Sequence, residues 1–328
     1  MKKNDSVSKI SMIAKVGLAL AGAALTVASL QARDYSWEIV VDGLDSPKGI
    51  AAKFHNRVYY TEVPDPGVPG TEGGQNTVKL VRFRGNSNNI QSTTTISEGE
   101  PYPINLASEF FGDRIYWTCQ TAGVILSYTP RNGKEFFLPA DGLDAAEEDF
   151  LLDPTGITVD RFGDVLFTEL PMPGTLGPNM VSVSDGTNID LISNSEPAPT
   201  DITISFNGNA YWTCNTVGVI FKRSRAGVTS ILLDGLNSPT GIAVDRRGQR
   251  LYFTEVPNPG VGTPFDTSDD DEDRLYNTVK EYDLKTGEIS VVANDFPWPN
   301  DVSVNSRGDV FWTCTTAGVI ARARAFGN

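Results

Sequence analysis

Three side chains with oxygen ligands occupy the same place in a repeated sequence phrase. Asn105, Asp201 and Asp301 each stand two residues after a proline that opens a short alternating segment. Carboxylate and amide oxygens are the ligands that hard cations such as Ca²⁺ prefer. We therefore expect these residues to hold a divalent cation, calcium first among the candidates, if the fold brings them together. The alternative is that they cap turns at the starts of strands, as Asp and Asn do in many proteins.

A second set of carboxylates follows a threonine near the end of another segment. Glu62, Glu169 and Glu255 each come after Thr and before an apolar residue and a proline. We count them as contributors to the same cation site. The alternative is structural: a partly buried carboxylate here would accept a hydrogen bond from the backbone at the start of an adjacent repeat, where glycine leaves room.

The elements that must position these residues form a regular repeat. Each unit opens with proline, continues as an alternating strand, passes a turn that contains glycine, and ends a second strand in Thr-Glu or Thr-Cys. A third and a fourth strand follow, as in Val279 to Leu284 and Ile289 to Ala293. Four antiparallel strands in each of six units predict an all-β chain folded as a six-bladed β-propeller over residues 33–328.

Odd and even units differ, so the propeller is built as three two-blade repeats. The odd units carry Thr-Glu, place glycine (Gly49, Gly156, Gly241) two residues after the opening proline, and have long loops. The even units carry Thr-Cys, place Asn or Asp there, and have short turns. Because the first strand lines the channel and runs antiparallel to the second, both signatures should lie at one rim of the ring.

The chain ends indicate how the ring closes. The sixth unit has three strands, and residues 37–44 match the fourth strand at residues 230–236. We expect the N-terminal strand to complete the last blade, which hides an edge that would otherwise invite aggregation.

Cys119, Cys214 and Cys314 fill the position after threonine in the even units. A ring keeps equivalent positions farther apart than the ~7 Å between Cα atoms that a disulfide allows. We expect the three cysteines to be buried and unpaired, acting as small apolar residues.

The long loops of the odd units lie at the predicted signature rim. They run over residues 64–76, 171–179 and 257–277. Long loops on a rigid scaffold usually carry binding residues, so we expect a small molecule or a protein partner here. The candidate contacts are Asn76, Asn179, Asn277, Asp269, Asp270 and Asp271. The alternative for the acidic run is a solvated segment without a ligand.

The first 32 residues have the layout of a secretory signal. Lys2, Lys3, Lys9 and Lys15 precede an apolar run from Val16 to Leu30 that is too short to span a bilayer comfortably. We therefore expect an exported protein, periplasmic or extracellular, with no membrane span in the mature chain; an uncleaved anchor is the alternative. The formal net charge of −14 argues against nucleic acid as a partner, because that binding depends on Lys and Arg.

The repeats resemble the NHL and SMP-30/gluconolactonase-like propellers. The resemblance rests on segments such as residues 239–248 followed by Leu251-Tyr252-Phe253, and it covers roughly residues 36–324. It implies a six-bladed propeller. In the resembling lactonases a metal at the channel mouth is bound by Asp, Asn and Glu, which implies Asn105, Asp201 and Asp301 as ligands here, with Glu62, Glu169 or Glu255 contributing.

The residues that are absent narrow the chemistry. His55 is the only histidine, and the first-hairpin position expected for it lies away from the signature rim. A Ser-His-Asp triad is excluded, as is the His-dependent chemistry of the resembling lyases and paraoxonases. We expect no nucleotide and no haem.

Two functions remain. The first is an exported propeller that binds a ligand, a cation or a protein partner on its loop-bearing face, without catalysis. The alternative is a metal-dependent hydrolase of the lactonase type. The regular three-fold pattern favours the first, because enzyme sites in such rings usually break the repeat. Asn105 beside two aspartates keeps the second open.

Overall fold

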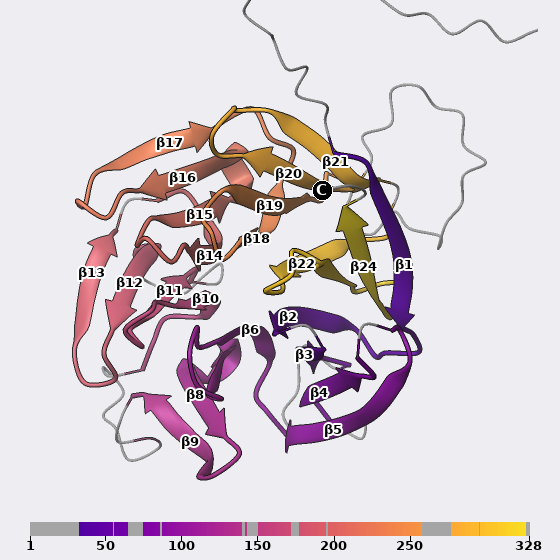
Figure 1. Cartoon of the computed structure of the whole chain (residues 1–328). Helices are drawn as coiled ribbons and strands as arrows, with labels where there is room; N and C mark the ends of the chain where they lie inside the picture. Colours follow the sequence, from indigo (N-terminus) through magenta and orange to yellow (C-terminus); the bar gives the residue numbers. More distant parts are fainter. Residues whose placement is uncertain are drawn as a thin grey trace, which may run out of the picture. The chain divides into compact units, whose positions relative to one another are not determined.

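Six four-stranded antiparallel sheets are arranged around a common axis, and the predicted six-bladed propeller is confirmed (Figure 1). The computed structural model describes residues 33–54, 56–64, 75–85, 87–139, 142, 150–171, 177–194, 196–257, 277–294 and 296–325. The predicted export signal, His55 and the acidic run Asp269 to Asp271 lie outside these ranges. No helix in the described part of the chain is long and apolar enough to cross a membrane.

Each blade begins with an inner strand that opens with proline. In the odd blades the strands are β2 (Pro47–Lys53), β3 (Arg57–Glu62), β4 (Thr77–Phe83) and β5 (Ile90–Glu98); β10 (Pro154–Val159), β11 (Val165–Glu169), β12 (Met180–Ser184) and β13 (Ile189–Ser193); β18 (Pro239–Val244), β19 (Arg250–Glu255), β20 (Thr278–Asp283) and β21 (Ile289–Asn294). In the even blades they are β6 (Pro103–Ser108), β7 (Ile115–Cys119), β8 (Val124–Thr129) and β9 (Gly133–Leu138); β14 (Pro199–Ile204), β15 (Ala210–Cys214), β16 (Val219–Arg223) and β17 (Thr229–Leu233); β22 (Pro299–Val304), β23 (Val310–Cys314), β24 (Val319–Ala325) and the N-terminal β1 (Tyr35–Val41).

The proline at each blade start is tolerated because the inner strand is an edge strand, where one face of the backbone needs no ladder partner. The residue before each of these prolines adopts a left-handed conformation, with φ between 47° and 54°. In the first blade the carbonyl of this residue, Ser46, accepts a hydrogen bond from the Val63 amide at 3.2 Å. The entering chain is therefore tied to the segment that follows the Thr-Glu phrase.

The threonine of the repeated phrase joins neighbouring blades. In the fourth blade the Thr213 hydroxyl accepts from the Asp201 amide at 3.1 Å and donates to the carbonyl of Thr240, in the next blade, at 2.6 Å. All six threonines are fully buried: Thr61, Thr118, Thr168, Thr213, Thr254 and Thr313. Thr118, Thr168, Thr254 and Thr313 donate to the next blade in the same way, so odd and even blades use the threonine of the phrase for one purpose.

Apolar side chains fill the spaces between blades. Trp117, Trp212 and Trp312 are completely buried on the second strands of the even blades. One cluster joins Leu166 and Val181 of the third blade to Trp212 and neighbouring residues of the fourth. Burial of this kind contributes roughly 25 cal/mol for each Å² of apolar surface.

The cysteines beside the tryptophans are free and buried, as predicted. Burial raises the pKa of all three thiols, and for Cys214 it raises the pKa to about 12. At neutral pH they are therefore protonated apolar groups rather than nucleophiles.

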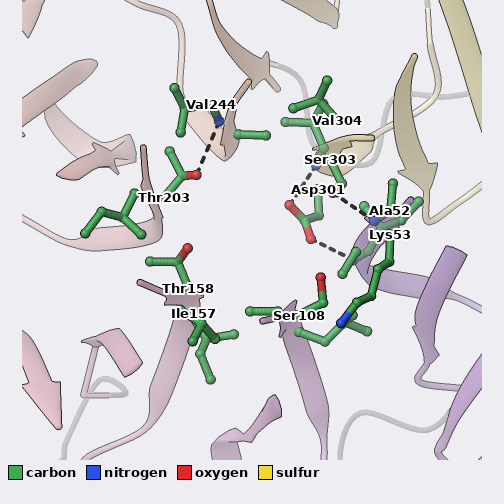
Figure 2. Close-up of a pocket in the computed structure, with 18 of the residues that line it drawn as sticks. Ala52, Lys53, Ser108, Ile157, Thr158, Thr203, Val244, Asp301, Ser303 and Val304 are labelled. Atoms are coloured by element: carbon green, nitrogen blue, oxygen red, sulfur yellow. Dashed lines mark hydrogen bonds between the residues drawn. The ribbon is translucent and has the colours of Figure 1, made fainter. Parts of the chain in front are cut away.

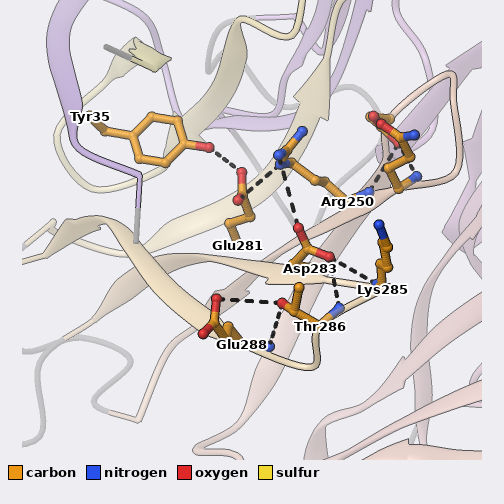
Figure 3. Close-up of polar contacts among 9 residues, drawn as sticks. Tyr35, Arg250, Glu281, Asp283, Lys285, Thr286 and Glu288 are labelled. Atoms are coloured by element: carbon orange, nitrogen blue, oxygen red, sulfur yellow. Dashed lines mark hydrogen bonds and ion pairs between the residues drawn. The ribbon is translucent and has the colours of Figure 1, made fainter. Parts of the chain in front are cut away.

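The N-terminal strand closes the ring, as predicted: β1 pairs antiparallel with β24 as the outermost strand of the last blade. Glu38 accepts from Arg322 across this pair at 2.7 Å. Figure 3 shows a second tie, in which the Tyr35 hydroxyl donates to Glu281 of the fifth blade. Arg250 also donates to Glu281, at 3.1 Å, so the closing strand is anchored to two blades.

Candidate functional site

The inner strands of the six blades surround a cavity of about 170 Å³. Figure 2 shows hydroxyl groups on its wall together with aliphatic side chains. Two of the hydroxyls complete the wall by accepting from neighbouring inner strands: Ser303 accepts from the Ala52 amide at 2.9 Å, and Thr203 accepts from the Val244 amide at 3.2 Å. The cavity therefore has a rigid, mixed polar and apolar lining.

At the end of the cavity where the prolines lie, Asn105, Asp201 and Asp301 meet; we call this the carboxylate end. The Asn105 amide donates to Asp201 at 2.8 Å, and the carboxyl groups of Asp201 and Asp301 hydrogen-bond to each other. All three are less than 9% exposed. The structure thus brings the three predicted residues together at the channel.

Glycine in the odd blades makes this convergence geometrically feasible. A Cβ atom on Gly156 would lie 2.4 Å from the Cα of Asp201, and one on Gly241 would lie 2.6 Å from the Cα of Asp301. No side chain fits in that space. Gly and Asp therefore alternate around the ring because the inner strands touch backbone to backbone at this level.

Both aspartates accept hydrogen bonds from backbone amides. Asp201 accepts from the amides of Ile202 and Ile242, each at 2.8 Å. Asp301 accepts from the amides of Val302 and Ile50, each at 2.7 Å. Each carboxyl group thus caps its own strand and the inner strand of the following blade, and so satisfies edge amides that would otherwise be buried without a partner.

Burial sets the protonation of this pair. It raises the pKa of Asp201 to about 7 and that of Asp301 well above its ordinary value, and the neighbouring carboxyl raises the pKa of Asp301 further. Two carboxyl groups in contact do not both ionise near neutrality, because their charges repel. The pair therefore holds a shared proton.

The same contacts bear on the predicted cation site. The oxygens that would face a cation already accept hydrogen bonds, and the proton between Asp201 and Asp301 occupies the place of a positive charge. Within the described ranges, no group of three or more His, Cys, Asp or Glu side chains is arranged to hold a metal ion. A cation held by Asn105, Asp201 and Asp301 would therefore have to compete with backbone amides and with protons for the carboxylate oxygens.

The glutamates of the second set lie on second strands and do not line the cavity. Glu62 pairs with Lys79, and Glu255 pairs with Lys280. Glu255 also accepts from the Asn237 amide at 3.0 Å, and Glu169 accepts from the Leu152 amide at 2.7 Å. The glutamates thus bond side chains of the third strand or the backbone that enters their own blade. The structural alternative expected a backbone hydrogen bond of this kind, but from the start of an adjacent blade.

The asparagines that end the long loops also bond the backbone. Asn76 donates to the Glu100 carbonyl at 3.0 Å, and Asn179 donates to the Glu196 carbonyl at 3.1 Å. Asn277 is buried. Asn76 and Asn179 therefore fix the ends of two loops, whose central residues lie outside the described ranges.

Lys53 is one of the cavity residues that sequence reasoning missed. It ends the inner strand of the first blade, at the opposite end of the cavity, which we call the lysine end. Its side chain is 4% exposed and points into the channel (Figure 2). An alignment of the six inner strands would have revealed it, because the other five blades have Glu109, Asp160, Ser205, Asp245 and Asn305 at this position.

Comparisons with solved structures show the fold. A gluconolactonase from Xanthomonas campestris aligns with a TM-score of 0.62 at 14% identity, over 92% of this chain and 93% of the other. A protein of unknown function from Bacteroides thetaiotaomicron aligns with a TM-score of 0.64 at 14% identity, over 89% and 76%. A virginiamycin B lyase from Staphylococcus aureus aligns with a TM-score of 0.53 at 17% identity, over 90% and 88%.

No family model matches the chain, and no curated protein matches it. The expected resemblance is therefore confirmed in the fold, which gluconolactonases and virginiamycin B lyases share with this chain. At this level of identity the likeness carries no assignment of activity.

Proposed function

We propose that the protein is an exported β-propeller that binds a small polar molecule in its central channel, without catalysis. The observation that carries this proposal is the use of Asp201 and Asp301. The side chains best suited to hold a metal or to act on a substrate are engaged by buried backbone amides and by each other. What remains for a ligand is a hydroxyl-bearing cavity of fixed shape, which is the usual form of a small-molecule site.

A thermal-shift screen of small polar metabolites tests the proposal. The variant Ala52→Phe places a ring at the cavity wall, and Thr94→Phe places the same ring on the exposed strand β5 of the same blade as a control. We expect a binding compound to raise the Tm of the wild type and of Thr94→Phe, and not that of Ala52→Phe. A compound that shifts all three equally binds elsewhere and contradicts the proposal.

The metal-dependent lactonase is the second candidate, and one observation favours it. A carboxyl group whose pKa is about 7, as burial makes that of Asp201, is suited to general-base catalysis near neutral pH. The fold shared with gluconolactonases supports the same candidate.

Elemental analysis of the purified protein and a lactone-hydrolysis assay distinguish the two functions. A bound divalent cation, together with hydrolysis that Asp201→Asn and Asp301→Asn abolish, would establish the lactonase. The binding function predicts no metal at one equivalent and no hydrolysis above the rate of the buffer, with or without added Ca²⁺ or Zn²⁺.

A further inference from the structure

Lys53 is the position at which the ring of inner strands breaks its own pattern. In the third, fifth and sixth blades the residue at this position caps the following turn: Asp160 accepts from the Phe162 amide, Asp245 from the Gln249 amide and Asn305 from the Arg307 amide. Lysine has no acceptor and cannot make such a cap. The first blade therefore lacks this turn-capping hydrogen bond and has the cationic side chain of Lys53 at the cavity instead.

Among the residues that the structure describes, the ammonium group of Lys53 has no hydrogen-bond partner, although Lys53 is only 4% exposed. Two carboxylates that act on the charge of Lys53 are paired with arginines: Asp113 with Arg57 at 3.2 Å, and Glu109, which also lines the cavity, with Arg114 at 4.0 Å. The ring of Phe54 lies 5.7 Å from the Lys53 nitrogen. A buried cation without a bonded anion is costly, so its presence in the native fold calls for an explanation.

Other donors lie in the same third of the ring. Ser108 belongs to the second blade, and Figure 2 shows the Lys53 side chain extending toward the side of the channel where it lies. In the third blade the amide of Val159 corresponds to those of Ala52 and Val244. Its partner position in the preceding blade is Ala107, which has no hydroxyl. Val159 thus receives no acceptor of the kind that Ser303 and Thr203 provide.

The mouth of the cavity adds a second cation and aromatic surface. Arg246 lines the cavity and stacks over Phe111 at 5.5 Å from the ring centroid. Phe111 and Phe110 both pack edge-on against Phe206. A planar anion would meet cationic groups and aromatic faces together here.

We propose that the lysine end of the channel is a binding site for a small organic carboxylate, whose carboxylate group bonds the Lys53 ammonium. This inference rests on the proposed channel-binding function and names the class of its ligand. A cavity of about 170 Å³ accepts a molecule of roughly the size of benzene. Ser108 and Val159 also line this cavity, where the Ser108 hydroxyl and the Val159 amide are further donors for a polar ligand.

Binding of this kind depends on pH in a stated direction. Burial lowers the pKa of Lys53; Asp113 and Glu109 act in the opposite direction, and Arg57 acts with burial. The cationic form is the one that binds a carboxylate. Affinity should therefore fall as the pH rises through the lowered pKa, well before free lysine would lose its proton, and it should weaken with added salt.

Calorimetric titration with sodium benzoate and with benzamide tests the site, because the two probes share a ring and differ in charge. The variant Lys53→Met keeps the length of the side chain and removes the charge. Lys48→Met is the matched control: Lys48 lies in the same strand, its pKa is also lowered by burial, and it stacks over Trp298 at 5.4 Å without lining the cavity. We expect benzoate to bind the wild type and Lys48→Met with the same affinity. Its affinity for Lys53→Met should be lower by a factor of about ten or more.

Each of the following results would overturn the inference. Equal binding of benzoate to Lys53→Met would place the anion elsewhere, and equal binding of benzamide to the wild type would remove the role of charge. Binding of inorganic phosphate in place of benzoate would exclude an organic carboxylate. If neutral compounds from the thermal-shift screen bind the channel and benzoate does not, the inference fails while the proposed function stands. If nothing binds the channel, both fail.

Discussion

The two ends of the central cavity are built from the same six strands and differ in how their polar groups are used. At the carboxylate end, Asp201 and Asp301 repeat with the blades, bond four backbone amides and share a proton. At the lysine end, Lys53 occurs in one blade only, and its ammonium group bonds no acceptor in the described part of the chain.

This difference helps to distinguish structural from functional polar residues in a repeat protein. A residue that recurs in equivalent blades solves a problem that the blades have in common, here the pairing of edge amides. A buried charged residue that is absent from the equivalent positions of the other blades lowers stability. The repeated fold does not require it, so its explanation lies in function. The carboxylate end is therefore expected to respond to substitution through stability, and the lysine end through binding.

The largest effect should come from removing the space at the carboxylate end. In Gly156→Ala the new methyl group meets the Asp201 backbone at 2.4 Å, which neither strand can avoid without moving. We expect a loss of about 3 kcal/mol or more in the free energy of unfolding, measured by urea denaturation. A loss below 1 kcal/mol would mean that the inner strands are less closely packed than described. Ser230→Ala, on the exposed strand β17, serves as the control.

A smaller loss is expected when one carboxyl group is removed. Asp301→Ala leaves the amides of Ile50 and Val302 buried without their acceptor. At roughly 1–3 kcal/mol for an unsatisfied buried group, partly offset by the relief of repulsion with Asp201, the expected loss is about 2–3 kcal/mol. Asp190→Ala, on the exposed strand β13, should change stability by less than about 0.5 kcal/mol. Equal effects of the two variants would contradict a structural role for Asp301.

The shared proton should make stability depend on pH. Because the pKa values of Asp201 and Asp301 are raised in the folded state, the native protein binds more protons than the unfolded chain above pH 4. The contribution of this pair to stability should be fully present below about pH 4 and should be lost as the pH rises through about 7. Asp301→Asn removes one of the two charges and should flatten this decline by roughly 1–2 kcal/mol. Chemical denaturation at pH 4, 5.5, 7 and 8 measures it, and parallel curves for the two proteins would refute the shared proton.

The smallest effect has the opposite sign and belongs to the lysine end. Lys53→Met, without any ligand, removes a buried cation that bonds no acceptor among the described residues, so it should raise the free energy of unfolding by about 1 kcal/mol at pH 7. Lys285→Met, which removes an exposed lysine, should leave stability unchanged. A loss of stability in Lys53→Met would show that the lysine is structural, and the contrast between the two ends would disappear.

Most of the fold could be predicted from the sequence because the repeat supplies the same information six times. Opening prolines and Thr-Glu or Thr-Cys phrases mark inner and second strands, and they pair as expected, with Pro47 opposite Glu62 and Pro299 opposite Cys314. The match between residues 37–44 and an outer strand was sufficient to predict the closing strand. The strands of one blade are mostly neighbours in sequence, so the repeated motifs were sufficient to predict the blades.

The candidate site was less predictable because its contacts join strands that are not neighbours in sequence. That Asn105, Asp201 and Asp301 would meet follows from their shared register. That the aspartates would be engaged by amides such as those of Ile50 and Ile242 depends on how closely adjacent blades approach, which composition does not show. Lys53 could have been identified from the sequence. It was missed because the candidate residues were chosen by their recurrence in several blades, and Lys53 occurs in only one.

The pairing of β1 with β24 also has a kinetic consequence. Glu38 and Arg322 bond across 284 residues of chain, so the last blade lacks its outer strand until nearly all of the polypeptide is available. Contacts this distant in sequence form slowly, because the intervening loop must be ordered first. Ring closure should therefore be a late step of folding, and until it occurs the other five blades form an open arc with exposed edges. A cell that makes this protein must keep that arc from aggregating until its first and last strands meet.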